Sequence, residues 1–469
     1  MRPLEIAIPI VLGLRFAWSL FFTRRSRWVD WLPTFALVLC IVHIWIEGCR
    51  WQMILIYFLA LVTFGFSIRD LREPETQHKI SRPTVIARSI FALTALVIAF
   101  TLPILLPVPG LPQPTGPYRV GTLTKHLIDF ERQELYNPHP GSLREVIVQI
   151  WYPAEADPAG TPAPWMEELD VMGPRISERI GMPSFFVDHV KYARTNSFPS
   201  ADLPIGGDRF PVLLFSHGWG GFRQQSTYLV EELASHGYVV VAVQHPYGAE
   251  ATVFPDGRIA YNKPQALPRD ASEDEYLFAA RQLVDQWAGD LSFVLDQLAL
   301  DNQPGSDSPF SNHLDMGRVG VLGHSTGGGA AIEFCGRNPR CKAVLGLDAF
   351  LTPISQSVLD KGMEQPALFL YSELWPSERN DRLHKSLIEN SDGPVDAYTV
   401  LGTDHYDFTD LPMLSPLSPY LGFKGPLEGK RTLDIIRHYS LEFFDSVFKG
   451  LPTNAQVVKS VEFPEVVFK

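Results

Sequence analysis

Ser325 stands in the pattern of residues that is most typical of a serine nucleophile. It is the middle residue of Gly323-His324-Ser325-Thr326-Gly327, which follows the apolar stretch 319–322 and precedes a helical run to Phe334. A serine at a tight strand-to-helix turn is held with its hydroxyl above the sheet, and the flanking glycines avoid collisions that a Cβ would cause. The backbone N–H of Thr326 then faces an oxyanion forming on a substrate. The motif alone is weak in a chain with 35 glycines, so its interpretation depends on partners for the serine.

Two later residues supply those partners. Asp348 directly follows the apolar stretch 343–347, and His405 follows the stretch 398–401. In this arrangement His405 takes the Ser325 proton and returns it to the leaving alcohol, while Asp348 holds the imidazole tautomer and stabilises the imidazolium. The chain order Ser, Asp, His is that of α/β-hydrolases and differs from the orders of chymotrypsin and subtilisin.

Other aspartates and histidines compete for these roles. Asp404 and Asp407 neighbour His405 in sequence, but side chains that close usually point away from its ring. Four histidines that precede the nucleophile serine are alternative bases, and each lies beside a turn or a helix end: His217, His236, His245 and His324. We therefore expect Asp348 and His405 to complete the site.

A second oxyanion donor is expected after the buried strand 210–215. This strand leads into Ser216-His217-Gly218-Trp219-Gly220-Gly221. A strand ending in H-G-x-G is where an α/β-hydrolase places its second donor. The backbone N–H of Trp219 is therefore the candidate, together with that of Thr326.

Alternating strand and helix patterns position these residues. A helical pattern over 225–236 ends at Gly237, and a long amphipathic helix is predicted over 274–300. Further strands are predicted at 145–152, 238–243, 343–347, 367–371 and 398–401, and a last amphipathic helix at 432–448. This spacing predicts a doubly wound, mainly parallel α/β sheet with its chemistry at the carboxyl ends of the strands. The last twenty or so residues fit no element.

The first 108 residues contain four apolar stretches of nearly membrane-spanning length: 4–22, 31–46, 51–68 and 85–108. Seven Lys or Arg residues follow the first and third stretches, whereas the opposite side has only Arg2 and Arg50. Because basic residues collect in cytoplasmic loops, this asymmetry predicts an all-α bundle of about four transmembrane helices, with the N-terminus and the following domain outside the cytoplasm. No paired charges within these stretches recommend a transport path.

The charge of the chain is unevenly divided. The formal net charge is −12, and residues 1–108 hold 11 Lys/Arg and 6 Asp/Glu, a net +5, so residues 109–469 hold −17. Such an acidic portion repels phosphate backbones, which argues against nucleic acid as a partner. The sequence has no H-E-x-x-H, no clustered carboxylate loop and no zinc-like cysteine spacing, so neither a metal ion nor another cofactor is expected. Cys335 and Cys341 either pair in an exported domain or stay buried as thiols.

These patterns predict four regions. The transmembrane region 1–108 is followed by a stiff Pro-rich linker, 109–118. A catalytic domain over 119–450 and a C-terminal tail, 451–469, complete the chain. Within the catalytic domain, the loop-rich stretch 154–207 is either a lid with an interfacial surface or a packed insertion.

The soluble half resembles the plasma and intracellular type-II platelet-activating-factor acetylhydrolases and their bacterial relatives, over roughly residues 116–448. The resemblance includes Gly116-Pro-Tyr-Arg-Val-Gly121, Trp151-Tyr-Pro153, Phe215-Ser-His-Gly-Trp-Gly-Gly-Phe-Arg223, Leu233-Ala-Ser-His-Gly237, Gly323-His-Ser-Thr-Gly-Gly328, Leu347-Asp-Ala349 and His405. It implies a calcium-independent serine esterase that removes short or oxidised acyl groups from the sn-2 position of phospholipids at a membrane surface.

Matched position by position, the resemblance makes Ser325 the nucleophile, Asp348 the acid and His405 the base, with the N–H groups of Trp219 and Thr326 as the oxyanion hole. The interval from Ser325 to Asp348 is similar to that of the family. The chain departs from the family in its added helices and in 154–207, which leaves the acyl chain and head group open.

We therefore predict a membrane-anchored serine carboxylic-ester hydrolase that works through an acyl-enzyme on Ser325, with its catalytic domain on the extracytoplasmic side. One alternative is a broad-specificity short-chain esterase or lipase with no phospholipid preference. The other is a membrane-bound sensor that uses the hydrolase fold to bind a ligand, although a sensor has no reason to keep a complete triad.

Overall fold

The computed structural model describes residues 1–22, 26–72, 81–155, 160–206, 209–452 and 462–469. The chain divides into two compact units. The first consists of residues 1–109 with two short later segments, 188–193 and 414–417, and the second consists of the remainder. The second unit holds every residue that the sequence marks for chemistry.

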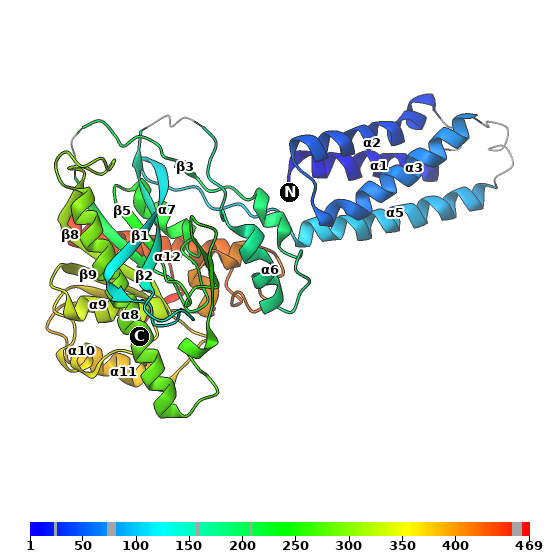
Figure 1. Ribbon diagram of the computed structural model, residues 1–469. Helices are drawn as coiled ribbons and strands as arrows, with labels where there is room; N and C mark the ends of the chain where they lie inside the picture. The colour runs from blue at the N-terminus through cyan, green and yellow to red at the C-terminus, as the bar shows by residue number, and fades with distance from the viewer. Residues whose placement is uncertain (23–25, 73–80, 156–159, 207–208, 453–461) are drawn as a thin grey trace. The chain divides into compact units, whose positions relative to one another are not determined.

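The first unit is built from four apolar helices, which are α1 (Pro3–Phe21), α2 (Arg27–Ile46), α3 (Ile54–Arg72) and α5 (Arg82–Leu105) (Figure 1). The short 3-10 helix η1 (Trp51–Met53) precedes α3. Small and medium side chains such as Leu12 and Ala60 fill the interior, whereas Trp45 and Phe91 are 87% and 76% exposed. All four helices are long and apolar enough, by length and composition, to cross a membrane.

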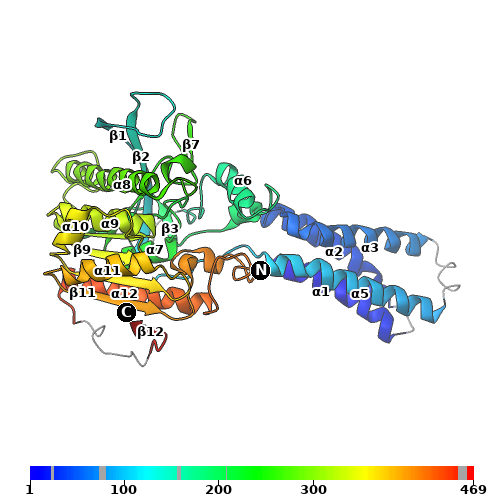
Figure 2. The same cartoon turned by 90° about the horizontal axis from the view of Figure 1, so that it is seen from below.

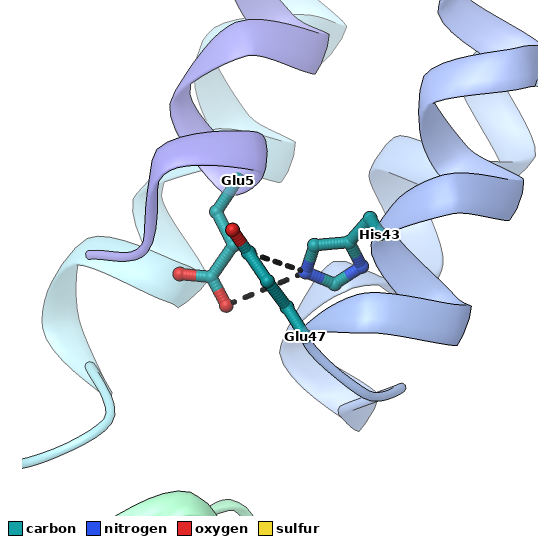
Figure 3. Close-up of side chains that lie close together, drawn as sticks. All are labelled: Glu5, His43 and Glu47. Carbon is teal, nitrogen blue, oxygen red and sulfur yellow. Dashed lines mark ion pairs between the residues drawn. The ribbon is translucent and has the colours of Figure 1, made fainter.

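One end of these helices holds a buried cluster of charges. Glu5 of α1 accepts hydrogen bonds from Arg50 Nε at 2.6 Å and Arg50 Nη2 at 2.8 Å, and also from Arg2 Nε at 2.9 Å. His43 of α2 lies between two carboxylates, with Nε2 at 3.7 Å from Glu5 and 3.5 Å from Glu47 (Figure 3). These pairs are not visible in the sequence, because the partners come from the ends of different helices and no local pattern reveals them.

Glu5, His43 and Glu47 bring ligand-type atoms within 4.8 Å of one another, as a bound metal ion requires. Two carboxylates and two guanidinium groups meet here, however, so their charges balance without an ion. Buried charges are tolerated when they are paired and hydrogen-bonded in this way. The cluster is an ion-pair network that fastens α1, α2 and the start of α3.

The segments 188–193 and 414–417 are part of this first unit. The Tyr192 hydroxyl donates to the carbonyl of Cys49 at 2.7 Å. Gly48 has a φ of +84°, and a Cβ there would lie 2.4 Å from the Tyr192 ring, so both the backbone and the packing require glycine. The hydroxyl of Ser415 donates to Leu105 O at 2.5 Å. Because these segments pack in the helical unit, experiments on this protein use the full chain.

The second unit is organised around one large sheet. Its described strands run in the order β12-β11-β10-β9-β8-β4-β5-β2-β1-β3. Neighbours from β5 through β4, β8, β9 and β10 to β11 are parallel. The antiparallel pairs are β2 with β5 and with β1, and β12 with β11. The observed architecture is the mainly parallel α/β-hydrolase type that the sequence predicts.

The strand bounds are β1 (Arg119–Gln133), β2 (Leu143–Ala154), β3 (Ser197–Pro199), β4 (Phe210–Ser216), β5 (Val239–Gln244), β8 (Leu314–His324), β9 (Cys341–Leu347), β10 (Ala367–Ser372), β11 (Val395–Val400) and β12 (Val466–Phe468). The strands β6 (Ala251–Val253) and β7 (Ile259–Tyr261) form a separate hairpin. The helices are α6 (Leu169–Arg179), α7 (Thr227–Ser235), α8 (Glu273–Asp301), α9 (Thr326–Arg337), α10 (Gln356–Lys361), α11 (Glu378–Glu389) and α12 (Gly429–Lys449).

Alternate residues of the strands pack on opposite faces of the sheet, as the two-residue period of a strand requires. Val212 and Leu214 of β4 join the core beneath α8 to α11. Leu213 and Phe215 join the core beneath α7 and α12 (Figure 2). Because both faces are covered, the central strands read as continuous apolar runs.

Five strands are not expected from the sequence: β1, β3, β6, β7 and β12. β1 carries Lys, His, Asp, Glu and Arg among its apolar residues; it pairs antiparallel with β2 and parallel with the edge strand β3. β12 lies in the tail that fitted no element, and its pairing with β11 is a tertiary contact that no local pattern signals. Cys335 and Cys341, left open by the sequence, form a disulfide between the end of α9 and the start of β9.

Candidate active site

The nucleophile turn joins β8 to α9 at one residue, Ser325. Its φ of 55° and ψ of −122° are values that a non-glycine residue adopts only when its surroundings hold it there. A Cβ on Gly323 would lie 2.2 Å from Gly327 O, and one on Gly327 would lie 2.2 Å from Ser216 O. The two glycines are therefore required by close backbone packing, as the sequence motif predicts.

Ser325, His405 and Asp348 form a continuous hydrogen-bonded chain. His405 Nε2 lies 2.9 Å from Ser325 Oγ, and His405 Nδ1 lies 2.6 Å from Asp348 Oδ2. Asp348 is buried, and its carboxylate also accepts the backbone N–H of Ser372 at 3.0 Å and the Ser372 hydroxyl at 2.8 Å. The carboxylate is thus fixed at the end of β9, and His405 is placed between it and the nucleophile.

The neighbouring aspartates hold backbone rather than the imidazole. Asp404 Oδ1 accepts the backbone N–H of His405 at 2.7 Å. Asp407 Oδ2 accepts the N–H groups of Asp404 at 2.8 Å and Gly425 at 2.6 Å. Burial raises the pKa of Asp407 to about 6. Both side chains hold the backbone at η4 (His405–Phe408), the short helix that begins at His405.

Three of the four alternative histidines are engaged away from the Ser325 hydroxyl, and the fourth, His324, adjoins the site. His236 pairs with Glu232 at 3.3 Å at the end of α7. His217 and His245 are fully buried behind the loop that follows β4. In the part of the chain that the structure describes, the Ser325 hydroxyl makes its hydrogen bond to the His405 ring.

The loop after β4 holds the candidate oxyanion donor, Trp219. A Cβ on Gly218 would lie 3.3 Å from Ser325 Cβ, so the loop passes beside the nucleophile. In the run 218–221 the N–H groups of the three glycines donate to Gln225 Oε1, Gly248 O and Gly218 O. Among the described residues, the Trp219 N–H has no protein acceptor. Thr326 is the first residue of α9, so its N–H lacks an intrahelical acceptor too.

His324, the residue before the nucleophile, links three parts of the site. Its Nε2 donates to His405 O at 2.9 Å, and Gln225 Nε2 donates to its Nδ1 at 3.1 Å. Burial, and then the nearby His405, lower the pKa of His324 well below its ordinary value, so the ring is neutral. The sequence marks His324 only as an alternative base. Its role as a connector follows from contacts that only the fold supplies.

Trp375 is a site residue that sequence reasoning missed. Its ring stacks on His405 with centroids 3.9 Å apart and planes inclined by 27°. An aromatic face attracts a cation, so Trp375 is placed to stabilise the imidazolium that forms when the histidine accepts a proton. The one sequence signal is its position just after β10, at the carboxyl edge of the sheet.

The arrangement suits acyl transfer. A hydroxyl lies within hydrogen-bonding distance of an imidazole, and a carboxylate orients that imidazole. The N–H groups of Trp219 and Thr326 are the candidate oxyanion donors. Such a set can attack an ester carbonyl and accommodate the oxyanion that results.

Comparisons with known proteins agree with this chemistry. A family model described as "Platelet-activating factor acetylhydrolase, isoform II" matches residues 107–458. The platelet-activating factor acetylhydrolase of Gallus gallus is 30% identical over 263 residues, which cover 50% of this chain and 62%, less than two thirds, of the relative. That of Cavia porcellus is 26% identical over 366 residues, covering 73% and 79%.

A solved structure, a ferulic acid esterase from Streptomyces cinnamoneus, matches with a TM-score of 0.62 and 29% sequence identity. The match covers 77% of this chain and 99% of that one.

Proposed function

The chain belongs to the platelet-activating factor acetylhydrolase isoform II family and is a carboxylic-ester hydrolase of the serine type, and from this premise we propose that it removes short or oxidised acyl groups from phospholipids while anchored in a membrane. The single observation that carries the proposal is the continuous series of hydrogen bonds through Asp348, His405 and Ser325. The N–H groups of Trp219 and Thr326 are the candidate oxyanion donors.

The proposed reaction proceeds in two halves. His405 accepts the Ser325 proton as Oγ attacks the ester carbonyl, and the N–H groups of Trp219 and Thr326 receive the oxyanion. Collapse of the intermediate releases the alcohol, which takes the proton from His405, and leaves the acyl group on Ser325. Water then attacks with His405 again as the base. Asp348 keeps Nδ1 protonated and aimed throughout, and Trp375 covers the face of the ring.

The membrane part of the proposal is supported by the four apolar helices and their exposed aromatic and aliphatic side chains. Seven Lys or Arg residues in or beside the connections between α1 and α2 and between α3 and α5 favour a cytoplasmic position for those connections. The catalytic part then lies outside the cytoplasm. The Cys335–Cys341 disulfide supports this side, since disulfides persist in oxidising compartments.

The proposed orientation predicts where Cys49 is reachable. Cys49 is exposed in the connection between α2 and α3, on the proposed outer side, whereas Cys40 is buried. We expect a membrane-impermeant maleimide to label the full chain in right-side-out vesicles, and to label it in inverted vesicles only after they are opened by detergent. A Cys49→Ser variant is the control. Labelling of sealed inverted vesicles alone would reverse the orientation.

The substrate class predicts a specific pattern of turnover. The full chain in mixed micelles should release acetate from 1-alkyl-2-acetyl-glycerophosphocholine and hydrolyse p-nitrophenyl acetate and butyrate. Phosphatidylcholine with two long acyl chains should react far more slowly. The Ser325→Ala variant should do none of these at the wild-type rate.

A second candidate, a broad short-chain esterase, is favoured by the similarity to the ferulic acid esterase. Turnover of methyl ferulate and p-nitrophenyl butyrate without release of acetate from the phospholipid would establish it and would overturn the phospholipid assignment.

A further inference from the structure

A second Ser–His–Asp chain lies inside the second unit. Ser216 Oγ lies 2.9 Å from His245 Nε2, and His245 Nδ1 lies 2.8 Å from Asp290 Oδ2. The residue types, atoms and distances parallel those of the Ser325–His405–Asp348 set. All three side chains are fully buried, however. An ester cannot reach that hydroxyl, so this set is not a second nucleophile and has another role.

Its place in the fold indicates that role. Ser216 is the last residue of β4, and His245 directly follows β5, the parallel neighbour of β4. Both therefore stand where His217-Gly218-Trp219 leaves the sheet. Trp287 of α8 stacks on His245 with centroids 4.2 Å apart and planes 7° from parallel, so the imidazole cannot tilt.

The acidic end of the chain is fixed from three sides. Asp290 of α8 accepts hydrogen bonds from Arg144 Nε at 3.0 Å and Arg144 Nη2 at 2.5 Å, and from Arg132 Nη2 at 2.9 Å. Burial alone would raise the pKa of Asp290, but the charge of Arg144 and hydrogen bonds from His245 and Arg144 hold it well below its ordinary range. Asp290 is thus a fixed acceptor. His245 Nδ1–H donates to it, and His245 Nε2 accepts the Ser216 hydroxyl.

His217, the residue after Ser216, extends this series of hydrogen bonds into the loop that follows β4. The backbone N–H of His245 approaches His217 Nε2 at 3.1 Å, and His217 Nδ1 lies 2.7 Å from Gly218 O. A backbone N–H can only donate, so Nε2 is the acceptor and Nδ1 carries the proton that goes to Gly218 O. Burial, and then His245, lower the pKa of His217 well below its ordinary value. The ring stays neutral, and this tautomer is the one that fits.

Gly218 O and the Trp219 N–H belong to the same peptide group. A trans peptide is planar, so its C=O and N–H point in opposite directions, and an anchor on one aims the other. Gly218 O is held by His217 on the buried side and by the Gly221 N–H at 2.9 Å. The Trp219 N–H is thereby directed away from this buried side.

We propose that Asp290, His245, Ser216 and His217 form a buried relay whose function is to orient the Gly218–Trp219 peptide, and so to set the oxyanion donor. The four are positioning residues for the reaction proposed above, on which this inference rests. The relay resembles a catalytic triad because the same three groups form a rigid, directional series of hydrogen bonds. Here that series orients a peptide group and transfers no proton.

Two substitutions of His217 distinguish an effect on the orientation of the Gly218–Trp219 peptide from an effect on packing. In His217→Asn the amide nitrogen replaces Nδ1 and can still donate to Gly218 O. In His217→Gln the amide lies one carbon farther out, at the position of Nε2, and the anchor on Gly218 O is lost, although glutamine is closer in volume to histidine. We expect kcat/KM of the full chain for p-nitrophenyl butyrate to fall about 100-fold in His217→Gln and less than about fivefold in His217→Asn.

The defect in His217→Gln should appear in kcat with KM little changed, because the oxyanion exists only after attack. It should also be smaller for the matching thionoester, since sulfur accepts hydrogen bonds poorly and draws less on the donor. The wild-type preference for the oxygen ester over the thionoester should therefore shrink in His217→Gln and persist in His217→Asn.

Equal losses in the two variants, or parallel losses for both esters in folded protein, would overturn the relay. If His217→Gln does not fold, Ser216→Ala, which leaves His245 Nε2 without its donor, tests the same ratio. Labelling of Ser325 by a fluorophosphonate also depends on the oxyanion donors, and its rate in the two His217 variants decides the inference even if every chosen ester proves a poor substrate. Poor turnover of every ester, with labelling slower in His217→Gln than in His217→Asn, would count against the proposed function and support the relay.

Discussion

Replacing Ser325 with alanine is expected to lower kcat for p-nitrophenyl butyrate by about 10⁴- to 10⁶-fold. The substitution removes the one hydroxyl that His405 Nε2 reaches at 2.9 Å, and with it the acyl-enzyme. It leaves the oxyanion donors in place, so a small rate enhancement over the uncatalysed reaction in water should remain. The folded state should be retained, because the backbone turn is held by the close packing of Gly323 and Gly327 rather than by the hydroxyl.

The measurement is steady-state turnover by the full chain in detergent micelles, with thermal melting to confirm the fold. A matched control is Ser357→Ala, which removes an exposed hydroxyl on α10 and should leave turnover unchanged. Wild-type turnover no higher than that of Ser325→Ala would overturn the catalytic assignment and bring forward the ligand-binding alternative.

Replacing Asp348 with asparagine should cost about 10⁴-fold in kcat. Asp348 accepts three hydrogen bonds, one from His405 Nδ1 and two from Ser372. An asparagine keeps its oxygen toward one partner and must turn an NH₂ group toward another. If that group faces His405, Nδ1 has to become an acceptor, and the proton moves to Nε2, where it blocks the Ser325 hydroxyl.

The rival aspartates provide controls of the same chemistry. Asp404→Asn and Asp407→Asn each retain an oxygen that can accept the backbone N–H groups they now bind. We expect either change to lower kcat less than about tenfold, as a shift in the placement of η4 rather than a loss of the acid. A larger effect at Asp404 or Asp407 than at Asp348 would reassign the acid.

Much of this fold follows from local sequence patterns. The strands from β4 to β11 are short apolar runs with turn residues at their ends, and the parallel sheet places the residue after each run at one edge. Asp348 and His405 are 57 residues apart, and the shared edge of the parallel strands is what predicts that they meet. The glycines at 323 and 327 are expected from close packing, and the observed distances agree.

What the sequence could not reveal depends on contacts between distant segments. Trp375 follows β10, and Gln225 lies just before α7. The two residues belong to the site only because the fold brings these two segments beside it. His217 and His245 look like alternative bases in sequence, whereas the structure shows them buried, with the His245 backbone N–H bound to the His217 ring and that ring bound to Gly218 O. Glu5 and Arg50 are 45 residues apart, and nothing local indicates that they pair.

Two residues of the site, Ser325 and Asp348, have positive φ values of 55° and 47° without being glycine. Each such backbone conformation costs on the order of 1–3 kcal/mol, and the rest of the fold must offset that cost. The strain lies at the two positions whose side chains the proposed reaction uses as nucleophile and acid. The stability of the second unit as a whole therefore holds the geometry of the site, and a distant change that loosens the fold also loosens the site.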